Sequence, residues 1–493
     1  MAKVLMVQGT SSDVGKSVFC AALCRWLSEE GYRVAPFKAQ NMALNAMVVP
    51  GGGEIGWAQV MQAEAACTAP RLEMNPLLLK PVSDTVCQVV VTGLAVGNLT
   101  AQQFQGYKKE AFPVVLAALE TLRREYDVVV IEGAGSPAEV NLRSHDIVNM
   151  GLAAAAEAPV LLVADIDRGG VFASIVGTLA LLSQEERERV RGLIINKFRG
   201  CTEKLRPGLT MLSSLTEKPV VGVLPYLGEL SLPPEDSLSL VRRHGGSGLE
   251  AAVIALPRIA NFTDYHVLAA EEGISLRYVS SPAEFGAPQL VILPGTKNTL
   301  ADLDFLQESG LDAKVKAAYR SGAFLLGICG GYQMLGQRIL DNLGSDGAGG
   351  SRLGLGLLPV ETEFGTVKTT ARVCGHTLPE GEELAGYEIH MGQTRRFGVR
   401  PFARLTTEDG KEYLDGAVSA DGRIIGTYLH GLFDAASFRQ SFLNRVRRAF
   451  NLPEQRGDNR SARQQREASY RLLAASVREH LDTAQLLQLL NEA

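Results

Sequence analysis

The chain has 493 residues, of which 46% are hydrophobic and 21% are charged, and its formal net charge is −5. A chain of this length is expected to form two or three domains rather than one core. The slightly acidic balance argues against a nucleic-acid partner, and no apolar run reaches the roughly 20 residues that span a bilayer. We therefore expect a soluble globular protein with no nucleic-acid or membrane partner.

The cysteines do not suggest structural disulfides or a zinc site. Seven are present and none forms a C-x-x-C pair. An odd number of unpaired cysteines suits a reducing compartment. The N-terminus carries only a short apolar run that leads into a glycine loop, unlike a signal peptide. These features favour a cytoplasmic protein.

The first part of the chain alternates apolar runs with helical patterns. We predict a strand over 3–8 and a helix over 16–30, with Gly31 in the position that a helix C-terminal cap prefers. Further strands, rich in Val, Ile and Leu as strands buried on both faces are, are predicted over 127–132, 160–165, 192–196 and 220–224. This alternation predicts a doubly wound parallel α/β sheet.

A phosphate-binding loop joins the first predicted strand to the first helix. Its sequence is GTSSDVGKS, from Gly9 to Ser17. Backbone N–H groups and the helix N-terminus would hold phosphate oxygens, while Lys16 would reach the β and γ phosphates and Ser17 would bind Mg²⁺. Thr10 stands where the common motif has its first glycine, and Gly15 precedes the lysine. The alternative, a plain glycine turn, is disfavoured by the strand–loop–helix context.

Polar residues follow other predicted strands of this half. Glu132 ends one strand, where ligands gather in open sheets, and is a candidate Mg²⁺ ligand. Asn196 and Lys197 end another strand and form a candidate adenine-contacting pair. Asp167 and Arg168 follow a third strand and are candidate substrate or metal contacts, although a solvated structural turn is nearly as compatible with them.

The second part of the chain begins after a change in composition. Pro233-Pro234, acidic residues and a glycine run indicate a linker over 229–249. Strands predicted over 251–256, 290–293 and 324–328 then start a second doubly wound α/β domain. Apolar residues at helical spacing predict a C-terminal helix over 470–490. The predicted plan is 1–228 for the P-loop domain, 229–249 for the linker, 250–442 for the second domain and 443–493 for a helical extension.

A nucleophile elbow follows the strand predicted over 324–328. The segment GICGGYQ, from residue 327 to Gln333, places Cys329 between glycines at a sharp strand-to-helix turn. The helix N-terminus favours the thiolate form. The backbone N–H of Gly330 would supply one half of an oxyanion hole, and Gly295 at the end of another strand would supply the other half. A buried structural cysteine is the alternative, and the demanding pattern argues against it.

A general base is expected to accompany Cys329. His430 follows an apolar run about a hundred residues later, an order and spacing similar to those of class I glutamine amidotransferases. In most of that class a glutamate two residues beyond the histidine orients it, but here Leu432 occupies the position. A backbone carbonyl or another carboxylate would have to orient His430. His390 is the second candidate base, with a substrate or structural role favoured for it.

The two halves together resemble one family. The phosphate loop and the element EGAG at 132–135 are similar to those of dethiobiotin synthetase, and Ser11 stands where partitioning ATPases carry a second lysine. PGTKNT at 294–299, GYEIHMG at 386–392 and HGLF at 430–433 resemble the cobyrinate amidases of cobalamin biosynthesis. That family joins a dethiobiotin synthetase-like ATPase to a class I glutamine amidotransferase-like domain.

Within this group, the N-terminal half resembles the cobyric acid synthases. The motifs are KAQNMALN at 38–45, with Ala39 where proline is expected, GEIG at 53–56 and DIDRGGVF at 165–172. The resemblance implies ATP- and glutamine-dependent amidation of the b, d, e and g carboxylates of adenosylcobyrinate a,c-diamide, through an acyl phosphate and glutamine-derived ammonia, with Mg²⁺. The possible substrate residues are Gln40, Asn41, Asn45, Glu64, Asp167, Arg168 and His390.

Other functions stay open at this stage. The residues themselves lead to ATP-dependent amidation but not to the corrinoid. A cobyrinate a,c-diamide synthase, or another glutamine-dependent carboxylate amidase such as a cell-wall lipid amidase, would carry similar motifs. A non-enzymatic P-loop switch with a degenerate amidotransferase domain is suggested by Leu432, while the presence of both Cys329 and His430 argues against it. The sequence does not predict an oligomeric state.

Overall fold

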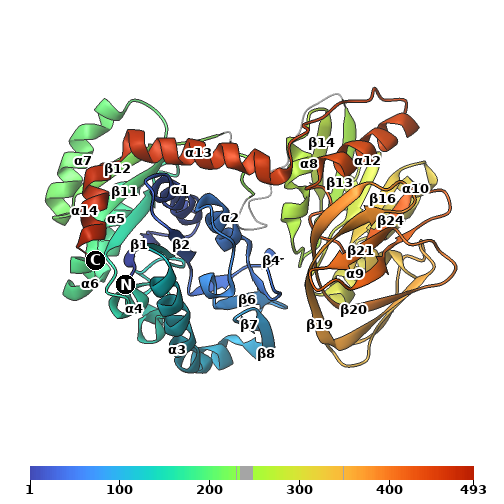
Figure 1. Cartoon of the computed structure of the whole chain (residues 1–493), viewed down its shortest axis with the longest axis horizontal. Helices are drawn as coiled ribbons and strands as arrows, with labels where there is room; N and C mark the ends of the chain where they lie inside the picture. Colours follow the sequence, from blue (N-terminus) through green and yellow to red (C-terminus); the bar gives the residue numbers. More distant parts are fainter. Residues whose placement is uncertain (229, 234–247, 348, 493) are drawn as a thin grey trace.

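The computed structural model describes residues 1–228, 230–233, 248–347 and 349–492. Figure 1 shows an N-terminal and a C-terminal lobe side by side, with helix α13 (Ala462–His480) running from one to the other. The linker predicted over 229–249 lies largely outside the described residues. Each lobe contains a parallel sheet and its own apolar core, so the predicted α/β fold with two such domains is confirmed.

The sheet of the N-terminal lobe has six parallel strands in the order β12-β11-β10-β1-β9-β2. Helices cover both faces: Leu5 packs on the side of α1, and its neighbour Met6 packs on the side of α3 and α5. Gly31, at φ 92°, follows the end of α1 as predicted. The strands are β1 (Lys3–Gly9), β2 (Val34–Phe37), β9 (Val128–Glu132), β10 (Val160–Asp165), β11 (Val190–Phe198) and β12 (Val220–Pro225). The helices are α1 (Lys16–Glu29), α2 (Trp57–Ala65), α3 (Ala101–Glu125), α4 (Met150–Ala155), α5 (Val171–Leu181), α6 (Gln184–Arg189) and α7 (Thr202–Thr216).

An insertion between β2 and α3, which the sequence patterns did not predict, extends toward the other lobe. It forms a four-stranded sheet in the order β3-β6-β7-β8 and a β4–β5 hairpin. Its strands are β3 (Gln40–Met42), β4 (Ala46–Val48), β5 (Glu54–Gly56), β6 (Leu77–Pro81), β7 (Val86–Val91) and β8 (Leu94–Thr100). Strand β4 contacts β19 and β20 of the C-terminal lobe, so the insertion forms part of the lobe interface.

The main sheet of the C-terminal lobe has the order β14-β13-β15-β16-β24-β23, with only the short β23 antiparallel. Its strands are β13 (Leu249–Ile254), β14 (Ile274–Val279), β15 (Leu290–Leu293), β16 (Phe324–Ile328), β23 (Ala417–Val418) and β24 (Ile424–Thr427). The helices are α8 (His266–Ala270), α9 (Thr299–Glu308), α10 (Leu311–Arg320), α11 (Gly330–Leu335) and α12 (Ala436–Ala449).

A second sheet of this lobe is built around a long antiparallel hairpin that the sequence patterns did not predict. Strand β20 pairs with β19, and the other strands have the order β18-β17-β19-β21-β22. A bridge between Tyr387 and His430 connects β20 to the segment after β24. The strands are β17 (Arg338–Asp341), β18 (Gly350–Leu353), β19 (Val360–Thr377), β20 (Glu383–Arg396), β21 (Ala403–Thr407) and β22 (Glu412–Asp415).

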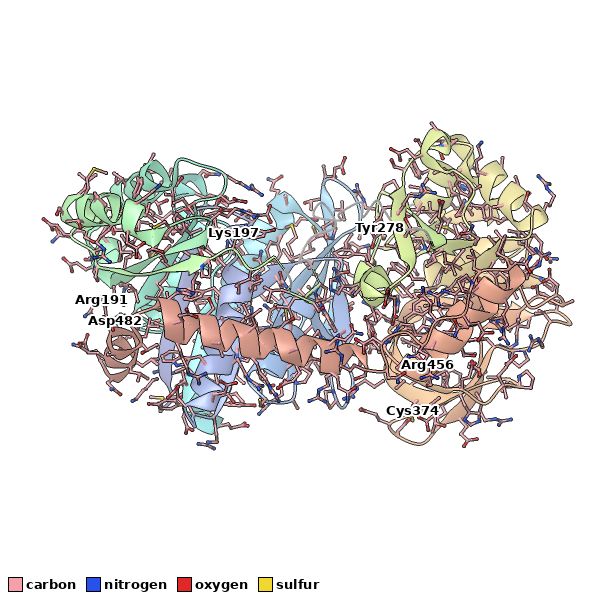
Figure 2. All side chains as sticks on the ribbon, turned by 90° about the horizontal axis from the view of Figure 1, so that it is seen from above. Arg191, Lys197, Tyr278, Cys374, Arg456 and Asp482 are labelled. Carbon is pink, nitrogen blue, oxygen red and sulfur yellow. The ribbon has the colours of Figure 1, made fainter. Side chains whose placement is uncertain are left out.

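The C-terminal region returns to the N-terminal lobe. The single helix predicted over 470–490 is instead two helices, α13 and α14 (Thr483–Asn491), because Asp482 caps the second by accepting from the Gln485 N–H at 2.9 Å. Figure 2 shows α13 running from the segment that carries Arg456 to Asp482. It packs on α1. None of the helices within the described ranges is long and apolar enough to cross a membrane.

A buried ion pair fixes α13 on α2. Arg466 donates to the two carboxylate oxygens of Glu64 at 2.8 and 2.9 Å, and both side chains are at least 87% buried. Replacing Arg466 with Met leaves the Glu64 carboxylate without its main partner. We expect a loss of about 3 kcal/mol in unfolding free energy, measured by urea denaturation. Arg471→Met, which removes a surface pair with Glu467, is the control and should unfold like the wild type; equal stability of the two variants would contradict the prediction.

Candidate active sites

The phosphate loop has the predicted strand–loop–helix geometry. Gly9 ends β1, and Gly15, at φ 94°, occupies the N-cap position of α1. A Cβ atom on Gly15 would lie 2.4 Å from Asn196 Nδ2, so glycine is required there. Lys16 Nζ donates to the carbonyls of Ser11 and Gly135 at 2.9 and 3.1 Å. The loop therefore presents helix N–H groups and an ammonium group to one anion-binding space.

Glu132 lies beside the loop and is 1% exposed. Its carboxylate accepts from Ser17 Oγ at 2.8 Å, from Lys38 Nζ at 2.7 Å and from Gln62 Nε2 at 2.5 Å. Within the described residues no three His, Cys, Asp or Glu side chains form a metal cluster. Adjacent hydroxyl and carboxylate oxygens nevertheless suit Mg²⁺, which takes one or two protein ligands and completes its shell with phosphate and water. The sequence patterns gave no role to Gln62 or to Lys38, although Lys38 is the first residue of the motif KAQNMALN.

The candidate adenine residues lie at the end of β11. Asn196 Nδ2 donates to the Val14 carbonyl at 2.8 Å, and Lys197 Nζ donates to Asp165 at 2.9 Å. Both line an apolar cavity of about 180 Å³ next to Gly15. The C-terminal helix α13 contributes Ser476 to this cavity, and the buried Oγ of Ser476 has no hydrogen-bond partner among the described residues.

The amide-rich stretch before α2 lines two cavities beside the phosphate loop. Gln40 and Asn41 line one of about 400 Å³, together with Lys16 and Glu132. Asn45 lines the other, of about 330 Å³, as does Arg168. Both polar atoms of Asn45 and Oε1 of Gln40 are buried without a hydrogen-bond partner in the described chain. Buried amides are normally paired, so these atoms are suited to a polar ligand.

The structure places two of the candidate substrate residues away from these cavities. Glu64 is held by Arg466 and by the Tyr470 hydroxyl at 2.9 Å, so it joins α2 to α13 and does not line the phosphate-loop cavities. Asp167 is exposed and pairs with Arg199 at 2.9 Å. Sequence position alone could not separate these residues from those that face the cavities.

Cys329 occupies the elbow between β16 and α11, as predicted. Its backbone has φ 52° and ψ −108°, a strained conformation for a residue with a Cβ atom. A Cβ on Gly330 would lie 2.6 Å from Thr296 Cγ2, and one on Gly331 would lie 1.9 Å from the Leu293 carbonyl oxygen. The glycines therefore allow the turn to pack against the segment after β15. The Sγ atom lies 3.6 Å from the Ile389 carbonyl oxygen.

A carboxylate from another element orients His430. His430 Nδ1 lies 2.7 Å from Asp264 Oδ2, and the Gly431 N–H donates to Asp264 Oδ1 at 2.9 Å. Asp264 lies in a short 3-10 helix, Phe262–Tyr265, after β13. Although burial lowers the pKa of His430, Asp264 and Cys329 raise it to about 10. Of the two alternatives left open by the sequence, the other carboxylate is the one observed, while Leu432 is buried in the core.

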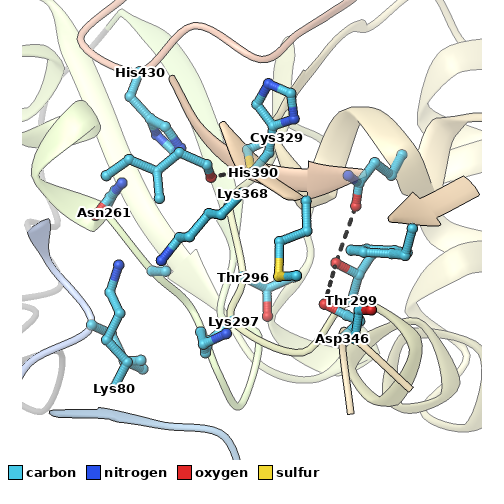
Figure 3. Close-up of a pocket in the computed structure, with 18 residues that line it drawn as sticks. Lys80, Asn261, Thr296, Lys297, Thr299, Cys329, Asp346, Lys368, His390 and His430 are labelled. Carbon is cyan, nitrogen blue, oxygen red and sulfur yellow. Dashed lines mark hydrogen bonds between the residues drawn. The ribbon is translucent and has the colours of Figure 1, made fainter. Parts of the chain in front are cut away.

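The remaining predicted residues meet Cys329 and His430 in one cavity of about 60 Å³, which Gly295, Gln333 and His390 also line (Figure 3). A Cβ on Gly295 would lie 3.0 Å from His430 Cε1 and 3.7 Å from Cys329 Cβ. Gln333 is held by Thr299 Oγ1 at 3.1 Å and by Tyr428 OH at 3.2 Å.

His390 is held on the wall of this cavity by contacts of its own. Its Nδ1 lies 2.8 Å from the Gly392 carbonyl oxygen, and its ring stacks on Tyr428 with centroids 3.9 Å apart. This environment favours His430 as the base and leaves His390 a packing or substrate contact.

Comparison with known proteins covers both lobes. Residues 5–240 match the CobQ/CobB/MinD/ParA nucleotide binding domain family, and residues 250–438 match the CobB/CobQ-like glutamine amidotransferase domain family. The chain is 49% identical to the cobyric acid synthase of Yersinia enterocolitica, over 99% of this chain and 98% of that one. It is 46% identical to the cobyric acid synthase of Dehalococcoides mccartyi, over 100% and 99% of the two chains. The cobyric acid synthase of Alkaliphilus metalliredigens is 47% identical over 98% and 99%.

The interaction of Asp264 with His430 predicts the reactivity of the thiol. Asp264→Asn removes a negative charge that raises the pKa of His430, so a smaller fraction of the imidazole is protonated and it stabilises the Cys329 thiolate less. We expect alkylation of Cys329 by iodoacetamide in the folded protein to slow by about tenfold. The extent of alkylation is measured by mass spectrometry of the peptide that contains Cys329, after the reaction is stopped and the protein is digested. Asp304→Asn, which removes a surface pair with Arg352, should react like the wild type; an unchanged rate in the Asp264 variant would count against this role.

Proposed function

The chain belongs to the cobyric acid synthase family, and we propose on that basis that it amidates the b, d, e and g side-chain carboxylates of adenosylcobyrinate a,c-diamide. Family membership makes it a glutamine-dependent ligase of cobalamin biosynthesis with a nucleotide-binding and an amidotransferase domain. The proposed details are the corrinoid carboxylates, the acyl phosphate, the Mg²⁺ ion and a cytoplasmic location. The observation that carries the proposed coupling of the two reactions is that Leu44 lines both the Cys329 cavity and the cavity of Lys16 and Glu132.

In the C-terminal lobe, Cys329 is the proposed nucleophile. Its thiolate attacks the side-chain amide carbon of glutamine, and the oxygen that becomes negative is stabilised by backbone N–H groups at Gly330 and Gly295. The imidazolium of His430, held by Asp264, donates its proton to the departing nitrogen as the C–N bond breaks. Ammonia leaves, and water then hydrolyses the thioester to release glutamate and the thiol.

In the N-terminal lobe, the proposed reaction is phosphoryl transfer to a substrate carboxylate. Lys16 and the loop N–H groups hold the ATP phosphates, with Asn196 and Lys197 beside the base. Ser17 and Glu132 would hold Mg²⁺, which neutralises phosphate charge when it is bound. A carboxylate oxygen attacks the γ-phosphorus and releases ADP. Ammonia then attacks the acyl carbon and phosphate leaves, so that the amide forms.

The substrate is proposed to bind in the cavities beside the phosphate loop. Gln40, Asn41 and Asn45 offer amide groups there, two of them with unpartnered buried atoms. Arg168 lines the same region and can attract a carboxylate. A corrinoid that carries several amides and carboxylates suits such a wall.

The positions of the cavities support direct use of the ammonia. Leu44 lines both the Cys329 cavity and the larger cavity that contains Lys16 and Glu132. Lys80 and Asn261 line the first cavity, while their chain neighbours Pro81 and Phe262 line the second. Neighbouring residues therefore line both cavities, and ammonia released at Cys329 is proposed to pass Leu44 on its way to the acyl phosphate.

The central test is the product. Purified protein is incubated with adenosylcobyrinate a,c-diamide, ATP and glutamine, and the corrinoid is followed by mass spectrometry. We expect up to four successive exchanges of a carboxylic acid for an amide, one for each of the four proposed side chains. An unchanged a,c-diamide together with amidation of cobyrinate itself would contradict the proposal and favour the a,c-diamide synthase alternative.

Cys329→Ala tests whether glutamine hydrolysis in the C-terminal lobe can be separated from amidation in the N-terminal lobe. The variant lacks the nucleophile, so glutamine-supported amidation and glutamate release should fall to background. Amidation supported by ammonium salts should stay within about twofold of the wild type, because the phosphate-loop lobe is intact. Glutamine-supported activity equal to that of the wild type would show that Cys329 is not the nucleophile.

Lys16→Ala should have the complementary effect. Removing the ammonium group from the phosphate loop should lower amidation by about a hundredfold or more with either nitrogen donor. Glutamate release measured without ATP should change little, since Lys16 does not line the Cys329 cavity. Selective loss of only the glutamine-supported reaction would contradict this assignment.

A further inference from the structure

The cavity of Cys329 contains a group of lysines that the mechanism above does not use. Lys80 comes from β6 of the N-terminal lobe, Lys297 from the segment after β15, and Lys368 from β19. Figure 3 shows the three side chains reaching into the same space from different elements. A small cavity with three ammonium groups on its wall is suited to a ligand that carries a negative charge.

One buried carboxylate, that of Glu54, forms ion pairs with two of these lysines. Lys80 Nζ lies 2.5 Å from Glu54 Oε2, and Lys368 Nζ pairs with the other oxygen of Glu54. Glu54 is 1% exposed, and although burial raises its pKa, the two lysines lower it to about 2. Glu54 therefore stays ionised, but its single charge is shared by two cations.

Lys297 is the third lysine of the group and does not pair with Glu54. Among the described residues, no carboxylate lies within salt-bridge distance of its Nζ atom. Burial and the neighbouring Lys368 and Lys80 lower its pKa to about 8, while Asp346 and Glu54 act in the opposite direction. An incoming anion would stabilise the charged form of Lys297, because an opposite charge nearby acts against the effect of burial and of the other lysines.

The same cavity also has an acidic side. Asp346 lines it and accepts from the Leu300 N–H at 3.0 Å. A wall with a lysine and a carboxyl group matches the zwitterionic end of an α-amino acid. The catalytic pair Cys329 and His430 lies in the same cavity, where the side-chain amide of that amino acid must be placed.

We propose that Lys297, supported by Lys80 and Lys368, binds the α-carboxylate of glutamine, so that the ATPase lobe supplies part of the glutamine site. This assignment rests on the proposed glutaminase function. The cavity, of about 60 Å³ against 400 Å³ for its neighbour beside the phosphate loop, is too small for a nucleotide or a corrinoid. Because Lys80 and Glu54 belong to the N-terminal lobe, glutamine binding requires the two lobes to be docked.

The test compares two amides that differ only in the group to be recognised. Glutaminamide keeps the side-chain amide and the α-ammonium group but has a neutral carboxamide in place of the α-carboxylate. Glutamate or isoglutamine release from the full-length enzyme is measured with each. For Lys297→Met we expect KM for glutamine to rise at least about tenfold with kcat within about twofold, and kcat/KM for glutaminamide to stay near the wild-type value.

Further variants separate recognition from folding. Lys297→Arg should recover most of the preference for glutamine, and Lys80→Met should weaken it in the same direction. Asp84→Asn breaks a surface ion pair with Arg258 that also joins the lobes but lies outside the cavity, so it should leave both amides unaffected. Ammonium-supported amidation should remain near the wild-type level in the two Lys297 variants and in Asp84→Asn.

Three outcomes would overturn the assignment. An equal loss of kcat/KM for both amides in Lys297→Met would show that the lysine does not bind the α-carboxylate of glutamine. Loss of ammonium-supported amidation in that variant would place Lys297 in the acceptor site instead. Absence of glutamine hydrolysis by the wild-type enzyme would overturn both this inference and the proposed function, whereas the first two outcomes leave the proposed function intact.

Discussion

The buried carboxylate of Glu54 at the lobe interface is the interaction on which the geometry of both sites depends. It pairs with Lys80 of its own lobe and with Lys368 of the other. A buried carboxylate cannot be left unpaired without a large desolvation cost, so this triad favours one arrangement of the lobes. That arrangement places Leu44 of the β3–β8 insertion against the Cys329 cavity. The insertion therefore lines both the Cys329 cavity and the cavity that contains Lys16 and Glu132.

The environment of His430, the proposed base, shows that a carboxylate can be supplied at a position in space rather than at a position in the sequence. Where related amidotransferases carry a glutamate two residues after the histidine, this chain has Leu432, which packs in the core. Asp264, 166 residues earlier in the chain, supplies the missing oxygen. It is held on a short 3-10 helix that follows the left-handed residue Asn261. Asn261 also accepts a hydrogen bond from the Ala46 N–H of the other lobe at 2.9 Å, so the orientation of His430 is connected to the lobe interface.

Helix α13 links the lobes a second time. Its N-terminal part is fixed by the Arg466–Glu64 pair, and its C-terminal part contributes Leu473 and Ser476 to the cavity beside Gly15. A segment that follows the amidotransferase domain in sequence thus completes the nucleotide side of the ATPase domain. Removal of this helix would open an apolar cavity as well as expose the face of α1.

The features that the sequence alone determined are those produced by consecutive residues. The phosphate loop and the Cys329 elbow each require a strand end, glycines that allow close approach or a left-handed backbone, and a helix start within about ten residues, so their geometry follows from local chain conformation. Most of the buried parallel strands were predictable for the same reason, because their apolar runs are continuous, but β2 and β14 were not predicted. The insertion strands β3–β8, the long hairpin β19–β20, Asp264 as the partner of His430, the engagement of Glu64 by α13 and the meeting of Lys80, Lys297 and Lys368 were not. Most of these strands lack continuous apolar runs, and the pairing of Asp264 with His430 and of Glu64 with α13 joins residues far apart in the chain. The meeting of Lys80 with Lys297 and Lys368 also requires the two lobes, each with its own core, to pack against each other.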